Sequence, residues 1–138
     1  MKIAVRYYTR SGNTKKLADA VASALAVPAK DVSVPLEEKT ELLFLGSSMY
    51  AADVNRDVKD FLQANAGKIG RIVCFSTAAV AHSTYKQVKK LADAAGIDIA
   101  EEEFACRGSF GIMHRDRPND RDLQNATDFA KGIVKKYF

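Results

Sequence analysis

Residues 2–21, KIAVRYYTRSGNTKKLADAV, contain the turn that decides the fold. Lys2 to Tyr8 reads as an apolar strand, and apolar residues recur at helical spacing over residues 14–26. The connecting turn, TRSGNT at residues 9–14, holds three hydroxyl side chains, an asparagine and a glycine. Because the N-terminus of a helix presents unpaired N–H groups and a positive dipole end, it favours an anion. One hydroxyl suffices to cap a helix, so the surplus favours a phosphate-binding loop over an ordinary capping turn.

Strands and helices alternate along the rest of the chain. Two continuous apolar runs, ELLFLGSS at residues 41–48 and IGRIVCFS at 69–76, are typical of strands buried on both faces. The other expected elements are strands at 32–34 and 97–106, a helix from Asp53 to Gly67, a helix around Val88 to Ala95 that Gly96 ends, and a helix from Pro118–Asn119 onward. Such alternation forces parallel pairing with right-handed crossovers. We therefore expect one α/β domain, residues 1–138, with a three-layer, doubly wound, five-stranded parallel sheet.

The composition limits the class of protein. With 138 residues, 47% hydrophobic and 28% charged, the chain reads as a soluble globular domain. No apolar run approaches the ~20 residues of a membrane span, and the chain begins directly with a strand, so we expect a cytoplasmic protein. Cys74 and Cys106 lie in apolar stretches and are expected to be buried, reduced thiols. Neither they nor His82 and His114 have metal-ligand spacing, so no metal site is expected.

Several segments together resemble the flavodoxin family. TRSGNT at 9–14 resembles its phosphate loop, whereas neither a GxGxxG dinucleotide motif nor a Walker GxxxxGK[ST] motif is present. GSSMYAADVNRDVKDFL at 46–62 resembles the third strand, first flavin loop and third helix of the family. FSTAA at 75–79 resembles the start of the second flavin loop, and FACRGSFG and RPNDRDLQNATDFAK resemble the C-terminal part. The resemblance implies a short-chain flavodoxin-like domain with strand order 2-1-3-4-5. It also implies noncovalently bound FMN and electron transfer between redox enzymes.

The resemblance also implies which residues bind the cofactor, and it implies no catalytic residue. The phosphate is expected at Thr9, Arg10, Ser11, Gly12, Asn13 and Thr14, with the Arg10 side chain directed to solvent. The flavin ring is expected at Ser48, Met49, Tyr50, Ala51, Ala52, Ser76, Thr77, Ala78 and Ala79. Tyr50 is the expected stacking residue, because an aromatic face adds to area burial, and Tyr85 is left open as a second one.

The charge departs from the family pattern and leaves alternatives open. Flavodoxins are typically acidic, whereas this chain has a net charge of +4, with further arginines in residues 114–122. No known nucleic-acid-binding motif accompanies the positive charge. The charge therefore indicates a redox partner with an acidic docking surface. The alternative function is an FMN-dependent oxidoreductase that acts on a quinone, a porphyrinogen or a similar planar substrate. A response-regulator receiver is disfavoured, because Tyr8, Thr9 and residues 46–48 stand where a receiver needs acidic residues.

Overall fold

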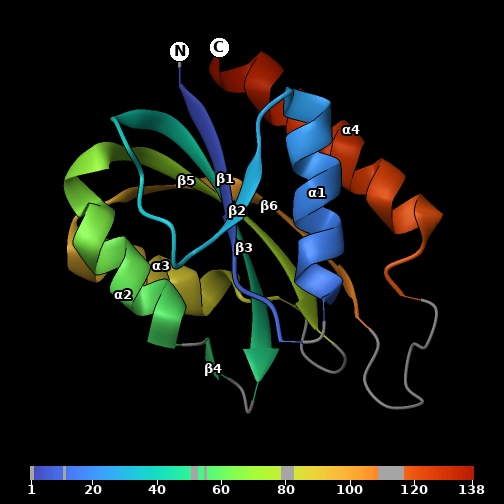
Figure 1. Ribbon diagram of the computed structural model, residues 1–138, viewed down its shortest axis with the longest axis horizontal. Helices are drawn as coiled ribbons and strands as arrows, with labels where there is room; N and C mark the ends of the chain where they lie inside the picture. The colour runs from blue at the N-terminus through green and yellow to red at the C-terminus, as the bar shows by residue number, and fades with distance from the viewer. Residues whose placement is uncertain (1, 11, 51–52, 55, 79–82, 109–116) are drawn as a thin grey trace.

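The computed structural model in Figure 1 describes residues 2–10, 12–50, 53–54, 56–78, 83–108 and 117–138. Its elements are, in chain order, β1 (Ile3–Tyr7), α1 (Asn13–Leu25), β2 (Ala29–Asp31), β3 (Thr40–Tyr50), β4 (Asp53–Val54), α2 (Arg56–Asn65), the 3-10 helix η1 (Ala66–Lys68), β5 (Ile69–Ala78), α3 (Tyr85–Ala95), β6 (Asp98–Arg107) and α4 (Asp120–Tyr137). None of the described helices combines the length and the apolar character that crossing a membrane requires.

All described strands except β4 form a parallel sheet in the order β2-β1-β3-β5-β6. The two-residue β4 pairs antiparallel with the end of β3. Counted without β4, the five parallel strands of the described chain follow the order 2-1-3-4-5. The predicted fold class is therefore confirmed. Because the strands are parallel, their carboxyl ends meet at one edge of the sheet, which is where ligands bind in doubly wound folds.

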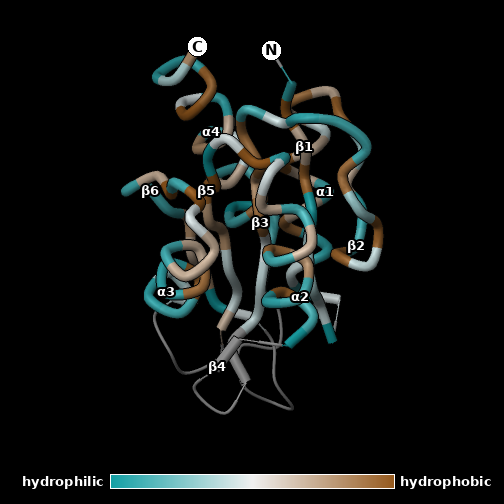
Figure 2. Tube along the Cα trace, turned by 90° about the vertical axis from the view of Figure 1, so that its left-hand side faces the viewer, coloured by the Kyte–Doolittle hydropathy of each residue, from teal (hydrophilic) through white to brown (hydrophobic). Residues whose placement is uncertain are grey.

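Helices cover both faces of the sheet. Figure 1 shows α1 and α4 side by side on one face, and α2 and α3 on the other. In Figure 2, brown and teal residues alternate along the helices, because each helix has one buried side and one exposed side. The layers are thus helix, sheet and helix, as the alternation of elements in the sequence predicts.

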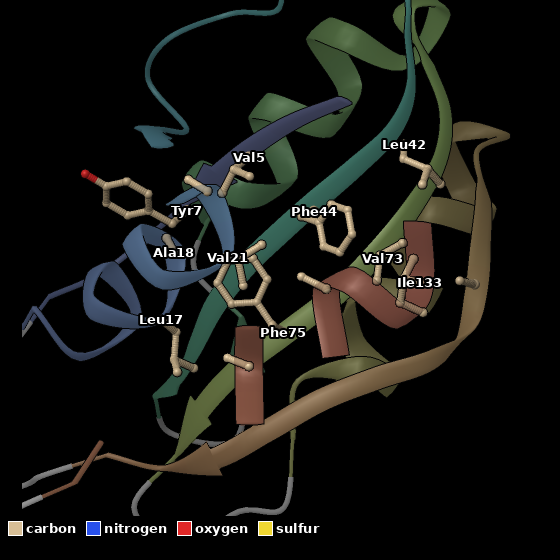
Figure 3. Close-up of a cluster of buried hydrophobic side chains, with 14 residues drawn as sticks. Val5, Tyr7, Leu17, Ala18, Val21, Leu42, Phe44, Val73, Phe75 and Ile133 are labelled. Atoms are coloured by element: carbon tan, nitrogen blue, oxygen red, sulfur yellow. The ribbon is translucent and has the colours of Figure 1, made fainter. Parts of the chain in front are cut away.

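Large aromatic side chains fill the face under α1 and α4 (Figure 3). Phe44 of β3 and Phe75 of β5 are both 0% exposed, and they pack with Val5 of β1, Leu17 of α1 and Ile133 of α4. The opposite face is mostly aliphatic, with Phe61 as its buried aromatic residue, and includes Leu43, Leu45, Ile72, Cys74, Val58, Leu62 and Val88. Residues from β3 and β5 enter both clusters, so these strands are buried on both faces, as their continuous apolar runs predict.

The prediction of a strand at residues 32–34 is wrong, because β2 lies three residues earlier, at Ala29–Asp31. The alternating sequence VSV suggested a strand, but Asp31 closes a turn there. Its carboxylate Oδ1 accepts a hydrogen bond from the Ser33 N–H at 2.8 Å, and its carbonyl accepts one from the Val34 N–H at 3.0 Å. An aspartate that bonds the backbone two residues ahead favours a turn, and this local chemistry outweighs the alternation.

The helix predicted to start at Asp53 begins later, at Arg56. Asp53 and Val54 instead form β4, which pairs with Tyr50 and Met49 of β3. Two-residue strands carry too little periodic pattern to be predicted, so the sequence offered no signal for β4. The end of this helix also differs, because α2 stops at Asn65 and η1 follows.

The two cysteines do not form a disulfide. Cys74 is buried and Cys106 is only half-buried, and both are free thiols, so the expected reduced state is confirmed and the expected burial holds for Cys74 alone. Burial raises the pKa of both thiols, to about 12 for Cys106, which keeps them protonated and unreactive near neutral pH.

A capping box fixes the start of α4. Asn119 accepts a hydrogen bond from the Asp122 N–H at 3.0 Å, and the Asp122 carboxylate accepts one from the Asn119 N–H at 2.9 Å. The Arg117 guanidinium donates to both oxygens of the same carboxylate. Burial alone would raise the pKa of Asp122, but these bonds outweigh burial and hold the pKa below its usual value.

We expect Asp122→Asn to lower the free energy of unfolding at pH 7 by about 1–2 kcal/mol, because it removes the charge but keeps the shape. A carboxyl with a lowered native pKa stabilises the fold above its unfolded pKa of about 3.9 and loses that contribution as pH falls. The difference between wild type and variant in urea denaturation should therefore shrink below about pH 4. A difference that stays constant from pH 7 to pH 3 would contradict this role of the charge.

Gly46 of β3 lies directly against the Phe75 ring. A Cβ atom at residue 46 would stand 2.3 Å and 2.5 Å from two ring carbons. We expect Gly46→Ala to lower the free energy of unfolding by about 1–3 kcal/mol, because the buried ring has no free space to move into. Urea denaturation measures the effect. Gly132→Ala is the matched control: it lies on an exposed side of α4 with no atom within 4 Å of the added Cβ, so it should be neutral or stabilising. Equal stability of the two variants would contradict the close packing.

Candidate functional site

The N-terminus of α1 begins at a glycine in the left-handed region. Gly12, the N-cap residue, has φ +91°, and an added Cβ there would meet no atom within 4 Å. Gly12 itself supplies no side-chain cap, and the first turn of α1 contains no acidic residue. The Thr9 hydroxyl accepts a hydrogen bond from the Gly12 N–H at 2.9 Å, which folds the turn back toward β1. The first N–H groups of a helix have no intrahelical acceptor, so the start of α1 is suited to an anion.

Three hydroxyl groups meet beneath this helix end. Thr14 of α1, Ser48 of β3 and Thr77 of β5 are 0%, 4% and 3% exposed. The Thr14 and Thr77 hydroxyl oxygens are 2.9 Å apart, those of Ser48 and Thr77 are 3.3 Å apart, and Thr14 and Ser48 are also hydrogen-bonded. We call these three residues the α1 hydroxyl cluster. It joins the first turn of α1 to the carboxyl ends of the two central strands.

A second group of hydroxyls lies on the other face of the sheet at the same level. The Ser47 hydroxyl oxygen is 2.6 Å from that of Thr84, the N-cap residue of α3. The Ser76 hydroxyl accepts a hydrogen bond from the Thr84 N–H at 3.4 Å. Ser47 pairs with Ser76, and Ser48 pairs with Thr77, in the register of β3 and β5. The last residues that β3 and β5 pair with each other therefore carry hydroxyls on both faces of the sheet.

Gly108, just after β6, closes the site from the side. A Cβ atom at this position would lie 3.0 Å from the side-chain nitrogen of Asn13 and 3.2 Å from the Cβ of Thr77. The Gly108 N–H also donates to the Ala78 carbonyl at 3.4 Å. The end of β6 thus contacts both the start of α1 and the end of β5, and a side chain at residue 108 would push them apart.

The structure brings together the predicted residues of three separate segments. Thr9, Gly12, Asn13 and Thr14 surround the start of α1, Ser48 and Thr77 join them through the α1 hydroxyl cluster, and Arg10 is exposed, as predicted. Ser76 and Ala78 lie at the same end of β5, with the Ser76 side chain on the opposite face. Ser11, Ala51, Ala52 and Ala79 lie outside the described residues, as do the side chains of Met49 and Tyr50.

Sequence reasoning did not predict the hydrogen bond between Ser47 and Thr84, which joins β3 to α3, or the close approach of Gly108 to Asn13 and Thr77. The signal for Ser47 was present, because two neighbouring polar residues follow the apolar run of β3 just as Ser76 and Thr77 follow that of β5. Tyr85, left open as a second stacking residue, is the first residue of α3. Among the residues that the structure describes, no group of three acidic, cysteine or histidine side chains could hold a metal ion.

Comparison with known proteins places the whole chain in one architecture. No family model matches the chain. An uncharacterized protein of Methanocaldococcus jannaschii is 27% identical over 89% of this chain and 91% of its own length. A flavodoxin from the domain Archaea has a TM-score of 0.77 at 19% identity and covers 99% of this chain, with 98% of its own chain covered.

Two further solved structures agree with this result. Oxidised Flavodoxin 1 from Bacillus cereus has a TM-score of 0.75 at 18% identity, over 100% of both chains. A flavoprotein in complex with FMN from Lactobacillus acidophilus NCFM has a TM-score of 0.60 at 17% identity, over 77% of this chain and 92% of its own. From these likenesses and from its strand order, this chain has the flavodoxin-like fold.

Proposed function

We propose that the chain is a single FMN-binding domain that carries electrons between redox enzymes. The observation that carries the proposal is the donor set at the start of α1: backbone N–H groups, the Thr9 hydroxyl and the α1 hydroxyl cluster, with no acidic residue in the first turn. The flavodoxin-like fold supports it, because a flavoprotein that shares this fold was solved with FMN.

The described residues fit the phosphate of FMN. A phosphate dianion accepts hydrogen bonds and repels carboxylates, and the start of α1 offers donors together with the positive end of the helix dipole. The absence of a side chain at Gly12 leaves open space where an acceptor side chain would otherwise compete. FMN, when bound, supplies the one- and two-electron chemistry, while this chain binds it, orients it and limits its contact with water.

We assign the phosphate to residues 9–14. We add Ser48, which was expected at the flavin ring, because its hydroxyl is hydrogen-bonded to that of Thr14. The flavin ring is assigned to residues 49–52 and 76–79. The described residues among them, 49–50 and 76–78, are the last residues of β3 and β5, at the carboxyl ends of the strands, where ligands bind in doubly wound folds. Tyr50 remains the proposed stacking residue. Two free cysteines agree with a reducing compartment, and we propose the cytoplasm as the location.

The proposed redox partner has an acidic docking surface. The net charge of the chain is +4, and exposed cations flank the site: Arg10 before α1, Lys16 in its first turns and Arg56 at the start of α2. A positive field around the site would steer acidic partners toward the flavin and repel basic ones.

We expect the purified chain to bind one FMN and to show the flavin absorption spectrum. Isothermal titration calorimetry should give an affinity for FMN at least about 10-fold higher than for riboflavin, because charge-assisted bonds to the phosphate exceed neutral ones. Absence of heat with FMN, or equal affinity for riboflavin, would contradict the assigned phosphate site.

In the same preparation, NAD(P)H consumption with a quinone should not exceed that of free FMN. Turnover above that level would favour the alternative, an FMN-dependent oxidoreductase.

Ionic strength should separate the two classes of partner. We expect the rate constant for electron transfer from the reduced chain to an acidic redox protein to fall between about 0.01 M and 0.5 M salt. With a basic redox protein of similar potential the rate constant should rise, because screening removes repulsion. Stopped-flow spectroscopy measures both. The opposite order would show that the local field at the site is negative despite the net charge.

A further inference from the structure

The α1 hydroxyl cluster contains one member that the phosphate assignment does not use. Thr77 was assigned from sequence to the edge of the flavin ring, but its hydroxyl oxygen lies 2.9 Å from that of Thr14 and 3.3 Å from that of Ser48. Thr77 is 3% exposed and pairs with Ser48 in the sheet register. Its side chain therefore contacts the phosphate-binding elements of the chain.

We infer that Thr77 is a positioning residue for the phosphate site. The inference rests on the proposed FMN function and deepens it. Gly12 provides no side-chain cap, so the first turn of α1 is held to the sheet through Thr14, which Thr77 and Ser48 bond from two neighbouring strands. Thr77 thereby fixes the helix end whose N–H groups face the anion, without contacting the anion itself.

Counting protons explains why a third hydroxyl is useful. Each hydroxyl has one proton to donate and two lone pairs to accept with. The three hydroxyls of the cluster have three protons for three mutual contacts, so every proton has an acceptor in the protein alone. When Thr77 donates its own proton to Thr14 or Ser48, the acceptor stays bonded and the protons of the other two hydroxyls are free to turn toward an anion. In a cluster of only two hydroxyls, turning both protons toward an anion would break the single hydrogen bond between them.

Gly108 strengthens the assignment to the phosphate end. A Cβ at residue 108 would lie 3.2 Å from the Thr77 Cβ and 3.0 Å from the Asn13 side-chain nitrogen. Thr77 thus lies near both the end of β6 and the first turn of α1, and a side chain at residue 108 would crowd Thr77 and Asn13 together.

Thr77→Val is the decisive variant, because valine has the shape of threonine but no hydroxyl. We expect its dissociation constant for FMN to rise about 10-fold, with the dissociation constant for riboflavin within about twofold of the wild type. Riboflavin keeps the ring and lacks the phosphate, so the ratio of the two constants reports on the phosphate end alone. Thr77→Ser retains the hydroxyl and should restore the wild-type ratio. Isothermal titration calorimetry measures the dissociation constants of both ligands for the wild type and for both variants.

Thr84→Val is the matched control. It removes an equally buried hydroxyl, 0% exposed, from the cluster on the other face of the sheet. We expect it to leave the ratio of FMN to riboflavin affinity unchanged, even if its stability in urea falls. Each variant is also compared with wild type in urea denaturation without ligand, to confirm that it folds.

Three results would overturn the inference. Equal weakening of FMN and riboflavin by Thr77→Val would return Thr77 to the flavin ring. Wild-type affinities for both ligands would show that its hydroxyl does not position the phosphate site, and a similar change of the ratio in Thr84→Val would point to general loosening. Failure of the wild-type chain to bind either ligand is a separate outcome, which would overturn the proposed function and this inference with it.

Discussion

Parallel pairing of β1, β3 and β5 is the constraint on which the rest of the structure depends. Helices cover both faces of the sheet, so the middle residues of β3 and β5 are apolar on both sides. Parallel direction places all the ends at one edge, so polar residues can enter the layer at that edge without disturbing the core. The contact of Gly46 with the Phe75 ring shows how closely β3 and β5 are packed just before that edge.

The change from apolar to polar occurs at the same level in both central strands. Phe44 and Phe75 lie in the core under α1, and the next residues on that face after Gly46 and Phe75 are Ser48 and Thr77. A buried hydroxyl is costly unless it is hydrogen-bonded, and here each finds a partner at the start of a helix, α1 on one face and α3 on the other. The hydroxyls therefore tie helix starts to strand ends, and a single register between β3 and β5 aligns both groups.

The sequence contains strong signals for the central strands and weak signals for the edges. Runs such as ELLFLGSS are long and apolar, so β3 and β5 could be predicted together with the parallel topology. β2 has three half-buried residues, and its position depends on the turn that Asp31 closes, which the pattern of hydrophobic residues does not record. For the site, the motif at residues 9–14 located the helix end, but the role of the Thr77 side chain depends on which face it occupies. That face follows from the register, which a single sequence does not provide.

The four described α-helices differ in the chemistry of their starts: those of α2 and α4 carry acidic residues in the first turn, whereas those of α1 and α3 do not. At α4 the chain supplies its own acceptors: Asn119 and Asp122 form a capping box, and Asp120 adds a second carboxylate in the first turn. At α2 the first turn contains Asp57. At α1 the first turn contains no acidic side chain, and Gly12 supplies no side-chain cap. Thr14 nevertheless anchors this turn firmly to the sheet. A helix end that is fixed in place and has no acidic side chain in its first turn is suited to an acceptor from outside, and a phosphate group can accept several bonds there at once.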